Sequence, residues 1–68
     1  MKIKVILRRG GVIELQFKNE KVRAFEILNK LNLQLPAIII LKNGRPIPED
    51  EELRDGDVLR VIDVHSGG

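Results

Sequence analysis

Apolar and polar positions alternate with a period of two residues in two stretches near the start of the chain. This alternation is typical of strands with one buried face. Gly10 and Gly11 separate the two stretches, and glycine readily adopts the positive φ that a tight hairpin connection needs. The pattern predicts a β-hairpin over residues 2–17, with these apolar side chains directed inward: Ile3, Val5, Leu7, Ile13, Leu15 and Phe17.

The period changes to that of a helix between Lys21 and Leu31. Apolar residues spaced i, i+3, i+4 and i+7 form one stripe of an amphipathic helix. Asn19 stands where an N-cap is expected, and Asn32 follows the last apolar position, where asparagine often ends a helix. The sequence therefore predicts one helix over residues 21–31, with this buried stripe: Ala24, Ile27, Leu28 and Leu31.

Three further strands are predicted in the second half of the chain. The first covers residues 37–42 and ends at Asn43-Gly44, a strong signal for a two-residue hairpin turn. The second covers residues 45–47, where Pro46 restricts it to the edge of a sheet. Residues 48–57 are polar, with Leu53 as their one apolar anchor and a turn at Asp55-Gly56. The last strand is expected over residues 58–64.

The predicted order is strand, strand, helix, strand, short strand, strand. A helix that joins a hairpin to further strands is expected to lie across one face of a mixed sheet in an α+β layer. This order is that of the β-grasp, or ubiquitin-like, fold, with four to five strands and one main helix. We expect a domain over residues 1–64 and a flexible tail over residues 65–68. The later part of the core would contain Ile38, Ile40, Ile47, Leu53, Leu59 and Val61.

The other face of such a sheet faces water, and the alternation shows which residues lie there. Several are aliphatic, including Val12, and they are mixed with Lys4 and Glu14. An apolar cluster rimmed by charge indicates a protein-binding surface more than it indicates strand propensity alone. The predicted partner-binding patch comprises Ile6, Ile39, Leu41, Arg60, Ile62 and Val64.

Composition narrows the possible functions. The 68 residues include no cysteine and only one histidine, His65, so no disulfide and no cysteine- or histidine-rich metal site is expected. The net charge is +2, and no aromatic side chains lie among the basic ones, which argues against nucleic-acid binding. The apolar runs are too short to span a membrane. We expect a cytoplasmic protein that is monomeric when free.

Three short segments together carry a family resemblance: Asn43-Gly44, the stretch LRDGD at 53–57, and Gly67-Gly68 at the end of the chain. The whole chain resembles the ubiquitin-like sulfur carriers, which include the thiamine-pathway carrier and the small subunit of molybdopterin synthase. The resemblance implies that an E1-like adenylyltransferase uses ATP to adenylate the carboxylate of Gly68, which then becomes a thiocarboxylate. Gly67 and Ser66 would be the narrow tail that reaches the activating site, and the predicted patch would dock the enzyme.

The destination of the sulfur stays open between thiamine, molybdopterin and tRNA thiolation. The approach to the glycines, IDVHSGG, lacks the longer proline-containing tail typical of the molybdopterin-synthase subunit, which favours the thiamine type. Two other functions are a protein modifier conjugated to lysines and a non-covalent adaptor. An enzyme is disfavoured because Ser66 and His65 lie in a tail that cannot hold catalytic geometry. We assign no catalytic residue, no metal and no bound cofactor; a synthase or thiolation enzyme would accept the sulfur.

Overall fold

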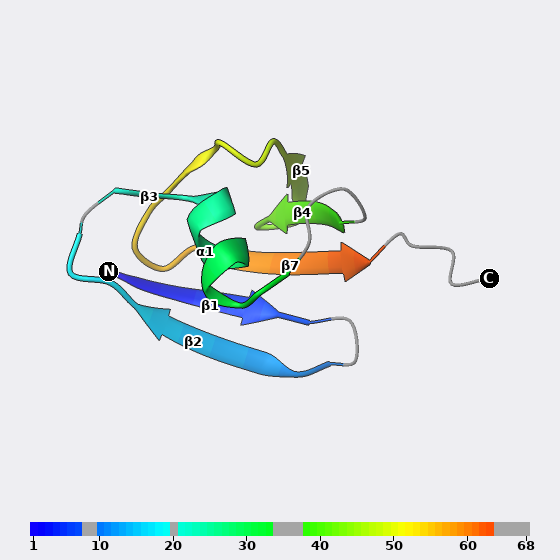
Figure 1. Ribbon diagram of the computed structural model, residues 1–68, viewed down its shortest axis with the longest axis horizontal. Helices are drawn as coiled ribbons and strands as arrows, with labels where there is room; N and C mark the ends of the chain where they lie inside the picture. The colour runs from blue at the N-terminus through cyan, green and yellow to red at the C-terminus, as the bar shows by residue number, and fades with distance from the viewer. Residues whose placement is uncertain (8–9, 20, 34–37, 64–68) are drawn as a thin grey trace.

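A mixed sheet of five strands forms the body of the protein (Figure 1). The computed structural model describes residues 1–7, 10–19, 21–33 and 38–63. Across the sheet the order is β2-β1-β7-β4-β5, so the first and last strands of the chain lie side by side near its centre. The bounds are β1 Lys2–Ile6, β2 Val12–Gln16, β4 Ile38–Lys42, β5 Arg45–Ile47 and β7 Val58–Asp63.

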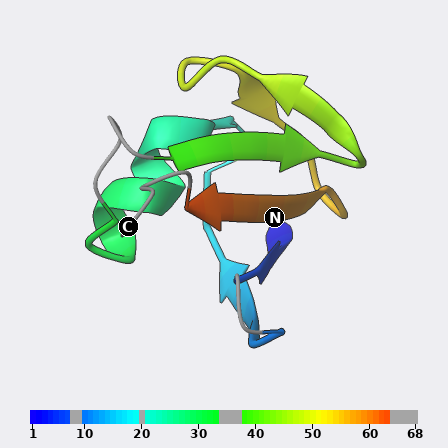
Figure 2. The same ribbon diagram turned by 90° about the vertical axis from the view of Figure 1, so that its right-hand side faces the viewer.

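One pairing in this sheet is parallel and the others are antiparallel. β1 runs parallel to β7, whereas β1–β2, β4–β5 and β4–β7 are antiparallel. Figure 2 shows β4 and β7 running side by side in opposite directions. The predicted α+β, β-grasp architecture is confirmed, and so is the edge position of the strand that contains Pro46.

The turn at Asn43-Gly44 fixes the register of β4 and β5. Asn43 has φ of 50° and Gly44 has φ of 88°, so both central residues are in the left-handed region, as a type I′ hairpin turn requires. Lys42 is therefore paired with Arg45, and Leu41 with Pro46. The dipeptide predicted this turn because asparagine and glycine tolerate positive φ better than other residues.

Helix α1 (Ala24–Lys30) is shorter than the sequence indicated. The prediction that it begins near Lys21 with Asn19 as its N-cap is wrong. Residues Val22–Arg23 instead form the short strand β3, which pairs with β6 (Glu52–Leu53). Arg23 takes the N-cap position, and the carboxylate of Glu26 accepts a hydrogen bond from the Arg23 backbone N–H at 2.7 Å. Pairing with β6 holds residue 22 in an extended conformation that helical periodicity alone could not reveal.

The end of α1 agrees with the prediction at Asn32. This residue has φ of 58°, and its N–H donates to the carbonyl of Asn29 at 3.1 Å. The N–H of Leu33 donates to the carbonyl of Leu28 at 2.9 Å. These two bonds form a Schellman motif, which satisfies the last carbonyls of the helix and turns the chain back toward the sheet.

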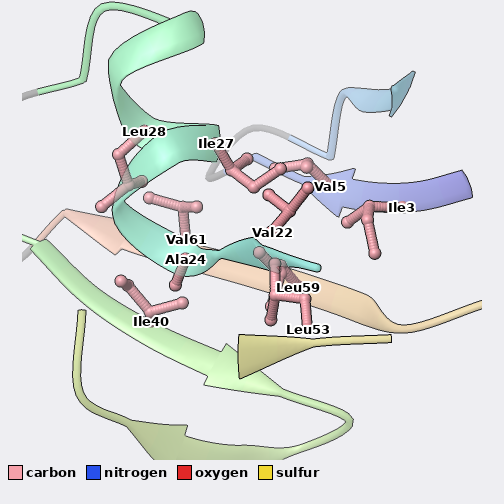
Figure 3. Packing of buried hydrophobic residues seen from close by; sticks show 10 residues of the cluster. All are labelled: Ile3, Val5, Val22, Ala24, Ile27, Leu28, Ile40, Leu53, Leu59 and Val61. Carbon is pink, nitrogen blue, oxygen red and sulfur yellow. The ribbon is translucent and has the colours of Figure 1, made fainter. Parts of the chain in front are cut away.

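The core lies between α1 and one face of the sheet. Figure 3 shows the side chains of α1 directed toward those of the strands beneath it. Of the inward positions predicted in the second half of the chain, Ile40, Leu53, Leu59 and Val61 are buried. Ile13 on the edge strand β2 is only half-buried. Val22 is a core residue that the predicted helix stripe omitted. The buried residues are Ile3, Val5, Val22, Ala24, Ile27, Leu28, Ile40, Leu53, Leu59 and Val61.

Partly buried side chains extend this core. They include the remaining inward positions of the predicted strands and the last residue of the helix stripe. Met1 and Leu33 join them, although the sequence pattern did not indicate either. The partly buried group is Met1, Leu7, Leu15, Phe17, Leu31, Leu33, Ile38 and Ile47. Two predicted strand ends, Ala37 and Val64, lie outside the described residues, as does the tail at 65–68.

Candidate functional site

The outer face of the sheet, opposite α1, brings together side chains from all five strands. Paired residues of adjacent strands share a face, so the registers define a row across the sheet. Arg60 of β7 is paired with Ile6 of β1 on one side and with Leu41 of β4 on the other. Ile6 is in turn paired with Val12, and Leu41 with Pro46. The row therefore runs Val12, Ile6, Arg60, Leu41, Pro46.

A second row lies one step further along the sheet. Ile39 of β4 is paired there with Ile62 of β7. Ile39 is 43% exposed and Val12 is 56% exposed, which is high for large aliphatic side chains. Ile6, Leu41 and Ile62 are half-buried. We call the residues of these two rows the outer patch: Ile6, Val12, Ile39, Leu41, Pro46, Arg60 and Ile62.

Five of the six residues predicted for partner binding are thus contiguous, namely Ile6, Ile39, Leu41, Arg60 and Ile62. The sixth, Val64, lies outside the described residues, and so do Ser66, Gly67 and Gly68 of the predicted reactive tail. The backbone of β7 is described as far as Asp63, which is paired with Ile38. The last described residue of β7 therefore lies next to the Ile39–Ile62 pair.

Pro46 was not predicted as part of the patch. A signal for it was present in the sequence, because a two-residue turn at Asn43-Gly44 places residues 41 and 46 opposite each other. If Leu41 faces outward, Pro46 must do the same. The pairing of Arg60 with Ile6 had no such signal, since it joins strands separated by most of the chain.

Two of the three segments that carried the family resemblance, Asn43-Gly44 and residues 53–57, belong to one hydrogen-bonded network. The side-chain oxygen of Asn43 accepts from the backbone N–H of Val58 at 3.0 Å, and its amide nitrogen donates to Asp57 Oδ1 at 3.1 Å. Asp57 Oδ2 accepts from the backbone N–H of Arg54 at 2.8 Å. The turn after β4 is thus joined to the turn before β7. We call this the Asn43–Asp57 clasp.

The turn before β7 is also joined to the start of β1. The backbone N–H of Gly56 donates to the carbonyl of Lys2 at 2.9 Å, and Asp55 Oδ1 accepts from the Lys2 backbone N–H at 2.7 Å. Asp55 and Asp57 therefore satisfy backbone donors that would otherwise lack partners at the strand ends. The NG and LRDGD segments serve the architecture, and the outer patch contains neither of them.

A shallow polar depression lies beside the clasp, and its charges are largely paired. Lys42 Nζ lies 2.7 Å from Glu51 Oε2, and Arg23 Nη2 lies 3.7 Å from Glu52 Oε1. The Arg23 guanidinium also donates to the carbonyl of Asp50 at 2.9 Å. These contacts hold the segment between β5 and β6 against the rest of the domain. The lining residues are Arg23, Lys42, Asn43, Asp50, Glu51, Glu52, Arg54 and Asp57.

The described part of the chain has neither a cluster of metal-binding side chains nor a helix that could span a membrane. Among residues 1–7, 10–19, 21–33 and 38–63, there is no group of three or more histidine, cysteine, aspartate or glutamate side chains that could hold a metal ion. In the same part of the chain, no helix has the length and apolar character needed to cross a membrane.

Comparison with known proteins agrees with this architecture. The structure is similar to the crystal structure of the thiamine biosynthesis protein ThiS from Geobacter metallireducens, with a TM-score of 0.73 over the whole of both chains. The sequence identity is 20%, so this likeness shows the fold. The model of the ThiS family matches residues 8–68, which is most of the chain and includes the tail with Gly67 and Gly68. The chain therefore belongs to the ThiS family, within the ubiquitin-like sulfur carriers.

Proposed function

We propose that this protein carries sulfur for thiamine biosynthesis on the carboxylate of Gly68. The observation that carries the proposal is that the family match runs through residue 68, so the terminal glycines lie within the matched region. The similar structure comes from a thiamine biosynthesis protein, which supports thiamine as the destination rather than molybdopterin or tRNA thiolation. The short approach to the glycines, without proline, agrees with that choice.

The proposed chemistry begins with activation, because a carboxylate is a poor electrophile. A carboxylate oxygen of Gly68 attacks the α-phosphorus of ATP, and pyrophosphate leaves. A sulfur nucleophile at the oxidation level of sulfide then displaces AMP from the acyl-adenylate, which leaves a thiocarboxylate on the same carbon. The thiocarboxylate sulfur is the group that an acceptor synthase would take. The chain has no cysteine, so it cannot carry the sulfur as a persulfide.

In this proposal the protein is the substrate of other enzymes and not a catalyst. The polar side chains of the clasp and the depression make structural hydrogen bonds and ion pairs. An E1-like adenylyltransferase would bind ATP and perform the activation. The contribution of this chain would be a terminus narrow enough to enter that active site, since glycine lets two backbones approach closely.

The outer patch is proposed as the docking surface for that enzyme. Gly68 is six positions beyond Ile62, so a fully extended tail would span about 20 Å from the edge of the patch. A partner seated on the patch could therefore receive the carboxylate in a site at roughly that distance. Docking and reaction would therefore use adjacent parts of the chain. A non-covalent adaptor would bind its partner through the same outer patch, without the reaction at Gly68.

The test is ATP–pyrophosphate exchange with the purified E1-like adenylyltransferase of the same organism. Deleting Gly68 should abolish exchange, because the new terminus falls about 3.5 Å short of the reacting phosphate. Gly67→Val should also fail, since a β-branched side chain restricts and widens the tail where the channel must close on it. Exchange at the parent rate after the deletion would falsify the carrier function. The parent protein isolated from its host should also show a mass matching one oxygen replaced by sulfur.

A further inference from the structure

Arg60 has an unusual position on the sheet. It lies on the central strand β7, and the registers place Ile6 on one side of it and Leu41 on the other. Val58 and Ile62 are the next residues on the same face of its own strand. All four neighbours are half-buried aliphatic residues, whereas Arg60 itself is exposed. A permanent positive charge thus occupies the middle of an apolar surface.

The charges around the patch are mostly positive. On the described strands, the outer face carries Lys2, Lys4 and Arg60 as cations and Glu14 as its one carboxylate. Glu14 lies 3.8 Å from Lys2 Nζ. It lies two strands and one register step from Arg60, which is roughly 12 Å by standard sheet spacing. Among the side chains that the structure describes, which do not include that of Asp63, no carboxylate lies within ion-pair distance of Arg60.

Docking would change the environment of this charge. A partner that covers Ile6, Leu41 and Ile62 must also exclude water from the guanidinium between them. A buried charge without a partner is costly, whereas a hydrogen-bonded carboxylate compensates much of that cost. The guanidinium presents donors in a planar fork that matches a carboxylate with two parallel hydrogen bonds. Only an apolar surface with such a group near its centre complements this face.

We propose that Arg60 selects its docking partner by pairing with an aspartate or glutamate that the partner places inside an otherwise apolar contact. This inference rests on the proposed function, because the partner is taken to be the E1-like adenylyltransferase. It adds that recognition depends on one desolvated ion pair at the centre of the patch. The aliphatic neighbours alone would accept any apolar surface, so the arginine supplies the specificity.

Two substitutions test the pairing through the KM for the carrier in ATP–pyrophosphate exchange. Arg60→Glu places like charges opposite each other, and we expect KM to rise about 30-fold or more with little change in kcat. Arg60→Leu is the sharper test. If the contact were only apolar, leucine would match or improve binding. With an acidic partner, leucine leaves that carboxylate buried and unpaired, so KM should rise at least 10-fold.

Arg45→Glu is the matched control, because it makes the same change in charge. Arg45 is exposed on β5 and neighbours Pro46, so it belongs to the opposite face. The KM of the enzyme for the Arg45→Glu carrier should stay within about twofold of its KM for the parent protein. Thermal unfolding of each variant shows whether the domain is intact; if one Arg60 variant fails to fold, Arg60→Gln takes its place. A single Asp→Arg or Glu→Arg change on the enzyme should restore exchange with Arg60→Glu.

Three results would overturn the proposal. One is a parent-like KM for Arg60→Leu together with aggregation, which would show that the arginine only keeps the apolar face soluble. Another is a parent protein that sediments as a dimer and becomes monomeric with Arg60→Glu, which would make a second copy the occupant. The third is a parent-like KM for Arg60→Glu. If exchange still depended on Gly68 in that case, the Arg60 pairing would be wrong and the carrier function would stand. Failure of the pairing can thus be told apart from failure of the carrier function.

Discussion

Asn43 contributes more to this fold than an exposed side chain usually does. Its backbone adopts φ of 50°, and both polar atoms of its side chain are hydrogen-bonded, one to Val58 and one to Asp57. Asparagine is the residue that can do both, since it tolerates the left-handed region and offers a donor as well as an acceptor. The identity of residue 43 is therefore set by conformation and by bonding together.

We expect Asn43→Ala to lower the free energy of unfolding by about 2 kcal/mol, because it removes two hydrogen bonds and places a Cβ-bearing residue without compensation at positive φ. Asn43→Gly should cost less, since glycine relieves the conformational strain and loses only the bonds. Urea denaturation measures both. Asn19→Ala is the control and should change stability by under 0.5 kcal/mol, because Asn19 is exposed and does not cap α1.

Equal losses for Asn43→Ala and Asn43→Gly would show that the conformational part of this account is wrong. If Asn19→Ala lowered the free energy of unfolding as much as Asn43→Ala does, Asn19 would have to cap α1 after all.

At the scale of the element, β4 shows how one strand serves both the core and the surface. Ile39 and Ile40 are adjacent and chemically identical, yet Ile40 is 4% exposed and Ile39 is 43% exposed. Successive side chains of a strand point to opposite faces, so Ile39 lies on the outer patch and Ile40 faces α1. Ile39 and Ile40 therefore share the same side chain and the same strand and differ only in the face on which they lie.

Ile40→Ala should lower the free energy of unfolding by about 2 to 5 kcal/mol, as expected for truncating a buried isoleucine. Ile39→Ala should cost less than about 1 kcal/mol, because its side chain is only partly removed from water. Denaturant midpoints of the two variants, measured side by side, check the assignment of faces. Similar losses in both would mean that the outer face of β4 is covered in the free protein.

The five strands of the main sheet and their hairpins were predictable because their signals are local, whereas β3 and β6 were not predicted. Alternation of side chains and the Asn43-Gly44 dipeptide lie within a few residues of the structure they specify. The start of α1 was not predictable in this way. Val22 fits both a helical and an extended pattern, and its strand conformation depends on pairing with Leu53, which is far along the chain. Local periodicity carries no information about such a partner.

The same distinction between local and long-range signals applies to the residues of the candidate site. Which residues face outward followed from alternation, so Ile6, Ile39 and Leu41 were found. That Arg60 lies between two of them depends on the parallel pairing of β1 with β7, which joins distant parts of the chain. The reactive role proposed for Gly67 and Gly68 came from a family resemblance, because two glycines at a chain end have no structural signature of their own.

At the scale of the whole molecule, we expect stability and the proposed reactivity to depend on different segments. Among the residues that the structure describes, Val61 is the last buried core residue and Ile62 is the last residue of the outer patch. We therefore expect that deletion of Gly68 and Gly67→Val leave the urea midpoint of unfolding at the parent value, although both abolish activation. A midpoint lowered as much as in Ile40→Ala would mean that the tail packs on the domain.

The central place of β7 has a consequence for biosynthesis. β7 separates β1 from β4 in the sheet, and it is the last of these strands to leave the ribosome. Until then Ile6 and Leu41 lack the strand that joins them, and Arg60 is absent. A nascent or prematurely terminated chain consequently cannot present the proposed docking face. An activating enzyme that recognises this face would not bind products truncated before β7.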